Sequence, residues 1–155
     1  YCGRGSKRWK LDIKKILTLL FIITMISCNR NNIVEDVVTR HEDGNKKIAF
    51  SYEVDKDGNK TKVRETWYYM EGMKHLDGPI VNDKRNGEFE TYYKTGQVMS
   101  KGYFVDGIRE GEAVTYNENG NIRYMGQYKN GKECGIWKFY DEEGNIVKEI
   151  NKDLQ

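Results

Sequence analysis

Hydrophobic and polar residues alternate along most of the chain after residue 62. In the segment Gly87 to Tyr93, an apolar or aromatic residue stands at every second place, which is typical of a half-buried β-strand. A turn signal follows at residues 95–97, and a second segment of this kind runs from Val98 to Val105. This unit of two short strands and a turn predicts a β-hairpin.

The hairpin pattern repeats with a step of 24 residues. The glycines between residues 72 and 144 fall into four series with this spacing: Gly72, Gly96, Gly120 and Gly144; Gly78, Gly102 and Gly126; Gly87, Gly111 and Gly135; Gly107 and Gly131. A fixed period of this size is typical of a repeat architecture, in which each unit buries its apolar residues against its neighbours. Such arrays more often present a binding surface than catalyse a reaction.

Two glycine pairs predict how successive hairpins are joined. Asp106-Gly107 and Asn130-Gly131 favour tight turns, because both central residues of such a turn can adopt positive φ. Further turns are expected at Gly96, Gly120 and Gly144. We therefore expect an all-β protein, an elongated single-layer antiparallel β-meander built from 24-residue hairpins. We expect no helix in residues 63–151.

The N-terminal segment has a different composition. Basic residues between positions 7 and 15 precede an apolar run over residues 16–26, which is followed by Ser27-Cys28. This order is that of a secretory signal, and the apolar run is short for a membrane span of about 20 residues. Ser27-Cys28 resembles the lipobox of bacterial lipoproteins, which implies diacylation of Cys28 and cleavage before it. An uncleaved anchor, or a plain signal with an incidental cysteine, stays open as an alternative.

Removing this signal changes the charge of the chain. The whole chain has 26 basic and 24 acidic residues, and residues 1–27 hold six of the basic and one of the acidic residues. The remainder has 20 basic and 23 acidic residues and a formal charge of −3. A surface of this kind lacks the basic face that nucleic-acid binding requires. We therefore expect no nucleic-acid partner, and a membrane contact made through the lipid.

These features divide the chain into four parts. We assign residues 1–27 to a lipoprotein-type signal peptide and residues 28–40 to the lipidated cysteine and a tether, in which residues 33–39 form either a short strand or a frayed segment. Residues 41–62 form an N-terminal capping hairpin region, which a repeat array needs to protect its sheet edge. Residues 63–155 form the hairpin repeats. The expected location is the bacterial cell envelope, at the outer membrane or cell surface.

The sequence carries no constellation of catalytic residues. The two histidines, His41 and His75, lie in different expected elements. The stretch Asp55 to Asn59 partly resembles a calcium loop, but Gly58 occupies the fourth position of that loop and not the sixth. We therefore expect a non-enzymatic protein with no cofactor and no metal site.

Tyrosine is the residue type that suggests binding. Ten of the eleven tyrosines follow residue 50, and they provide amphipathic contact area for a partner. Strand alternation separates the tyrosine row from an apolar inner face with Phe89, Trp137 and Phe139. Packing within the sheet is the alternative role of the tyrosines. The candidate binding face consists of Tyr92, Tyr116, Tyr128 and Tyr140.

The repeated string resembles a known family. The run from Tyr128 through Gly131, Lys132, Gly135 and Trp137 to Tyr140 is similar to the MORN-repeat variant family, and the preceding unit matches less well because alanine replaces the aromatic residue at position 113. The resemblance covers about residues 63–151.

This resemblance implies a hairpin array that binds or scaffolds a partner without catalysis. Bacterial proteins of this kind include YwqK-type antitoxins. Two functions therefore stay open: an envelope-anchored module that binds or scaffolds a protein, and an antitoxin or immunity protein that neutralises a toxin.

Overall fold

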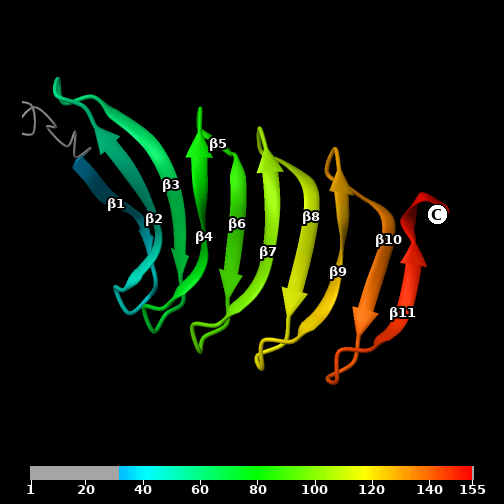
Figure 1. The fold of residues 1–155 in the computed structure, drawn as a ribbon. Coiled ribbons are helices and arrows are strands. Elements are labelled where there is room, and N and C mark those ends of the chain that lie inside the picture. Colours follow the sequence, from blue (N-terminus) through cyan, green and yellow to red (C-terminus); the bar gives the residue numbers. More distant parts are fainter. Residues whose placement is uncertain (1–31, 155) are drawn as a thin grey trace, which may run out of the picture. The chain divides into compact units, whose positions relative to one another are not determined.

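The computed structural model describes residues 32–154, which form one antiparallel β-sheet (Figure 1). Ten strands follow one another across this sheet in chain order, and the short β5 pairs with β4 beside this path. The strands are β1 (Asn32–Arg40), β2 (Lys46–Val54), β3 (Lys60–Tyr68), β4 (Lys74–Val81), β5 (Lys84–Arg85), β6 (Gly87–Tyr92), β7 (Val98–Val105), β8 (Ile108–Tyr116), β9 (Ile122–Lys129), β10 (Lys132–Tyr140) and β11 (Ile146–Asn151). The predicted single-layer β-meander is confirmed.

The helical content of the described residues is one short 3₁₀ turn, η1 (Lys152–Leu154). The prediction that residues 63–151 contain no helix is therefore confirmed. Residues 1–31 and 155 lie outside the described residues, and so do the predicted signal and the lipidation site Cys28. Of the two alternatives for residues 33–39, the structure has the strand, because β1 pairs with β2 over residues 32–40. The segment assigned to the tether thus contributes to the sheet.

The turns at the two ends of the strands differ. One type spans five residues, as at 93–97 and 117–121, where the N–H of Gly120 donates to the carbonyl of Asn117 over 2.9 Å. The other type has two central residues, both with positive φ: 50° and 85° at Asp106-Gly107, and 51° and 79° at Asn130-Gly131. The sequence predicted these turns correctly. The turn glycines Gly96, Gly120 and Gly144 also have positive φ, of 87°, 87° and 88°.

Very few side chains of the sheet are buried. Among residues 32–154 the buried hydrophobic side chains are Ala49, Ile80, Phe89 and Trp137. A single-layer sheet has no second layer against which to pack, so its apolar contacts form between side chains of neighbouring strands. The stability of this sheet therefore depends on a small number of contacts across each pair of strands.

The tight turn at Asn130-Gly131 gives a direct test of this geometry. We expect Gly131→Val to lower the free energy of unfolding by more than about 1 kcal/mol, because a β-branched residue is strained at positive φ. Lys132→Val is the matched control: it places valine one residue later, at an exposed strand position where β-branched residues are favoured. Urea unfolding of both variants measures the difference. Equal stability of the two would contradict the assigned turn.

Candidate ligand-binding face

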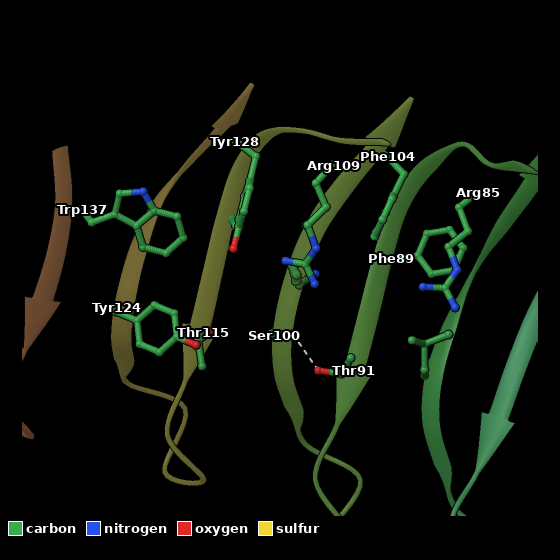
Figure 2. A pocket seen from close by; sticks show the side chains of 14 residues that line it. Arg85, Phe89, Thr91, Ser100, Phe104, Arg109, Thr115, Tyr124, Tyr128 and Trp137 are labelled. Atoms are coloured by element: carbon green, nitrogen blue, oxygen red, sulfur yellow. Dashed lines mark hydrogen bonds between the residues drawn. The ribbon is translucent and has the colours of Figure 1, made fainter. Parts of the chain in front are cut away.

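One face of the sheet carries a cluster of aromatic side chains. Alternation along β6, β7, β9 and β10 directs five rings to this face, and they surround a hollow together with residues of the strand between them (Figure 2). We call it the groove face, defined by Phe89, Phe104, Tyr124, Tyr128 and Trp137. The predicted inner positions Phe89 and Trp137 are indeed buried, with exposed fractions of 4% each.

Two of these rings lie directly over glycines of a neighbouring strand. A Cβ atom added at Gly78 would stand 2.4 Å from ring carbons of Phe89, and one added at Gly126 would stand 2.2 Å from the indole of Trp137. Neither glycine has the left-handed backbone conformation. Close approach of a ring, and not a turn, therefore explains why glycine occupies these two positions of the repeat.

The unit between them lacks this contact. Its glycine, Gly102, pairs with Ala113, and a Cβ atom added at Gly102 would lie an ordinary 3.9 Å from the Ala113 methyl group. The small alanine leaves a hollow of about 150 Å³ between Phe104 on one side and Trp137 on the other. The residues that line it are Leu76, Arg85, Phe89, Thr91, Ser100, Lys101, Gly102, Phe104, Arg109, Ala113, Thr115, Tyr124, Tyr128 and Trp137.

Arginine and aromatic side chains alternate along the groove face (Figure 2). The Trp137 and Tyr128 rings are perpendicular, with centroids 5.4 Å apart. The guanidinium carbon of Arg109 lies 5.1 Å from the Tyr128 centroid and 5.5 Å from that of Phe104. Arg85 then lies 5.6 Å from the Phe104 centroid on its other side. Each such cation–π contact is worth about 0.5–1 kcal/mol at an exposed site, so the row stabilises the sheet across β5 to β10.

Glu65 on β3 anchors one end of this row. Both of its carboxylate oxygens accept hydrogen bonds from the Arg85 guanidinium, over 2.9 Å each, and Oε1 also accepts one from the Trp67 indole over 2.6 Å. Burial raises the pKa of Glu65, but the hydrogen bonds and charge of Arg85, together with Trp67, outweigh it and hold this pKa below the usual value. Arg85 is thus neutralised within the sheet.

The opposite face carries the tyrosine row that the sequence predicted, with one correction. The hydroxyl group of Tyr92 donates to Glu90 over 2.5 Å, and that of Tyr140 donates to the Met125 sulfur over 3.3 Å. Like Tyr116, these two tyrosines are half-buried.

The grouping of Tyr128 with this row is wrong. On β9 the side chains of Tyr124 and Tyr128 line the hollow of the groove face, whereas Met125 between them contacts Tyr140. The period of 24 relates residues of equal position, and Tyr128 has a different position in the repeat from Tyr116 and Tyr140. The face to which the Tyr128 side chain points therefore depends on its own place in the alternation along β9, and not on the faces of the other tyrosines. The sequence reasoning also missed Arg85 and Arg109, which recur at the same spacing of 24.

Within residues 32–154, no three His, Cys, Asp or Glu side chains lie close enough together to hold a metal ion. The same part of the chain contains no helix long and apolar enough to cross a membrane.

A matched pair of substitutions tests the contact of ring and glycine. We expect Gly126→Ala to lower the free energy of unfolding by about 2 kcal/mol, because the added methyl group overlaps the Trp137 ring and forces it to move. Gly102→Ala meets no such ring and should leave stability within about 1 kcal/mol of wild type, since alanine loses less backbone entropy on folding. Thermal or urea unfolding distinguishes them; a larger loss for Gly102→Ala would refute the ring contact.

The Glu65–Arg85 pair predicts a pH dependence. Because folding lowers the pKa of Glu65 below 4.5, its stabilisation is present above that pH and disappears as the pH falls through the lowered value. We expect Glu65→Gln to cost about 1–2 kcal/mol at pH 7, and this difference from wild type should shrink at pH 3. Urea unfolding at the two pH values measures it. A difference that is equal at both would show that the carboxylate charge plays no part.

Comparisons with known proteins add little beyond the repeat itself. No curated protein matches the chain significantly. Two solved structures, one of TarM and one of an S. aureus TarM mutant in complex with Fondaparinux, alpha-GlcNAc-glycerol and UDP, are 13% and 14% identical to the chain, with TM-scores of 0.32 and 0.35. The matches cover 96% and 94% of this chain but 25% and 23% of those chains. This chain therefore spans about a quarter of their length.

The match to a protein family agrees with the hairpins of the structure. The MORN repeat variant matches residues 85–106, 109–130 and 133–151. Each segment contains a strand, a five-residue turn and the next strand, as in β8 and β9. The matches begin at residue 85, later than the expected residue 63. This family is not an enzyme family. Three consecutive segments within residues 85–151 are thus similar to the MORN repeat variant.

Proposed function

We propose that this protein is a non-enzymatic, lipid-anchored module of the bacterial cell envelope that binds a protein partner through its groove face. MORN repeats are generally modules that bind proteins or membranes. The observation that carries the proposal is the row of arginine and aromatic side chains along the groove face, with a hollow between them.

The composition of this row suits a protein interface. Tyrosine, tryptophan and arginine are the residue types enriched at the energetic centres of interfaces. Here they are held side by side by strand pairing, so a partner would not have to order them on binding. The hollow between Phe104 and Trp137 would accept one side chain of that partner. We therefore place the contact on this face and not on the row of Tyr92, Tyr116 and Tyr140.

The envelope location rests on the N-terminal sequence. The basic segment, the apolar run and the Ser27-Cys28 junction favour export and diacylation of Cys28. Two acyl chains suffice for stable anchoring, whereas one does not. With a formal charge of −3 after residue 27, the remainder of the chain would not bind anionic lipid by its charge. The lipid would hold the protein at the membrane and leave the groove face to the partner.

A toxin is one class of partner that this face would serve, so the antitoxin function stays a second proposal. Its support is the resemblance to YwqK-type proteins. The identity of the captured partner separates the two functions, because an antitoxin would recover a toxic protein whose activity it suppresses.

The test is capture of partners by the full-length chain, carrying a C-terminal tag, after cross-linking in bacterial cells. We expect the double variant Arg109→Ser, Tyr128→Ser to lose the partner that wild type recovers. The matched control Tyr92→Ser, Tyr116→Ser removes two tyrosines from the opposite face and should retain it, once circular dichroism shows that both variants fold. Loss of the partner in the control alone would place binding on the tyrosine row instead.

The same cells test the anchor. Wild type should incorporate an alkyne-labelled fatty acid and sediment with membranes, whereas Cys28→Ala should do neither. Unchanged labelling of Cys28→Ala would refute lipidation at this cysteine.

A further inference from the structure

The hollow over Ala113 contains a positive charge that the sheet does not neutralise. We propose that this hollow receives a carboxylate side chain, glutamate or aspartate, of the protein partner, with Arg109 as its ion-pair partner. The inference rests on the proposed protein-binding function and specifies its chemistry.

The repeat itself shows what Arg109 lacks. Arg85 and Arg109 stand 24 residues apart, at equal positions of successive units. Arg85 is paired through two hydrogen bonds of 2.9 Å with Glu65, which precedes it by 20 residues. The residue 20 positions before Arg109 is Phe89, which has no carboxylate. The next unit therefore keeps the arginine and loses its acid.

The other cations around the hollow are already paired. None of the lining residues is acidic, and the basic ones are Arg85, Lys101 and Arg109. Arg85 pairs with Glu65, and Lys101 pairs with Glu90 over 2.6 Å. Within residues 32–154, no carboxylate oxygen lies within 4.0 Å of the Arg109 guanidinium nitrogens. Arg109 is thus the cation to which an incoming carboxylate would bind.

The rings around Arg109 define the direction of approach. Its guanidinium group lies between Phe104 and Tyr128, 5.5 and 5.1 Å from their centroids, and Figure 2 shows it directed into the space between them. The two rings flank the guanidinium group, so a ligand would reach it from the open side of the hollow. The guanidinium group is a planar fork of N–H donors, which matches the two oxygens of a carboxylate. Arg109 is exposed, so the carboxylate of a partner could reach it.

Hydroxyl groups in the hollow also favour an acceptor ligand. Thr91 and Ser100 line the hollow, and their hydroxyl groups bond to each other over 2.6 Å. The hydroxyl group that accepts this bond keeps its own hydrogen for a ligand. About 150 Å³ accommodates a short acidic side chain. A phosphate dianion is disfavoured, because one arginine leaves half of its charge unneutralised.

NMR titration of the purified full chain tests the proposal without the partner. The probes are N-acetyl-glutamate methylamide, its glutamine analogue and inorganic phosphate. We expect saturable shifts of the Arg109 Nε–H and Ala113 methyl signals with the glutamate probe, and binding weaker by about tenfold with the glutamine analogue, since a hydrogen bond to a charged group is lost. Preference for phosphate over glutamate would overturn the carboxylate assignment.

Three variants complete the test. Arg109→Gln should abolish the glutamate response, and Ala113→Phe should block it by filling the hollow with a ring, as Phe89 does over Gly78. The control Arg123→Gln removes another exposed arginine, outside the hollow, and should bind the probe as wild type does. Equal binding by wild type and Arg109→Gln would refute the proposal. If the glutamate probe does not bind but the Arg109→Ser, Tyr128→Ser variant still loses its partner, the groove face remains the binding surface and only the carboxylate proposal is rejected.

Discussion

The structure depends on contacts between aromatic rings and the glycines of the neighbouring strand. A sheet of one layer cannot bury side chains against a second sheet or a helix, so each pair of strands must provide its own apolar contact. Phe89 over Gly78 and Trp137 over Gly126 achieve this by bringing a flat ring onto bare backbone. These two rings are among the few buried hydrophobic side chains of the described residues. In these two units the ring and the glycine stand at equal positions of the repeat, whereas the unit between them keeps the glycine, Gly102, and has Ala113 in place of the ring.

The same requirement links fold and function. Where the ring is present, the groove face is filled; where Ala113 replaces it, a hollow of about 150 Å³ opens. The arginines lie in the same row, between rings that hold their guanidinium groups in place. Glu65 neutralises Arg85, whereas Arg109 stays available to a ligand. The candidate site therefore exists because Ala113 departs from the repeat, while the rings of the neighbouring units form its walls.

The sequence predicts the fold well because glycines recur every 24 residues, and several of them stand at turns whose positive φ favours glycine. Gly107 and Gly131 predict the tight turns, and the alternation around Phe89 predicts the strands. It predicts the candidate site less well. Tyr128 was assigned to the wrong face, since its position in the repeat differs from that of the other tyrosines. The role of Gly126 depends on a ring from another strand, and periodicity alone does not reveal such a contact. Comparing Arg85 with Arg109 at the spacing of 24 would have identified the arginine row.

Native-state hydrogen exchange tests the central role of the ring contacts most directly. If rings over glycines hold neighbouring strands together, the pairing of β7 with β8 should be less stable than the pairing of β9 with β10, because Gly102 faces Ala113 and not a ring. We therefore predict that the free energy of opening, measured by amide exchange, is lower for the β7–β8 pair than for the β9–β10 pair beside Trp137. This order is the reverse of what fraying from the C-terminal edge would give, since β7 and β8 lie further from that edge. Protection that decreases smoothly from the middle of the sheet toward its two edges would contradict the account.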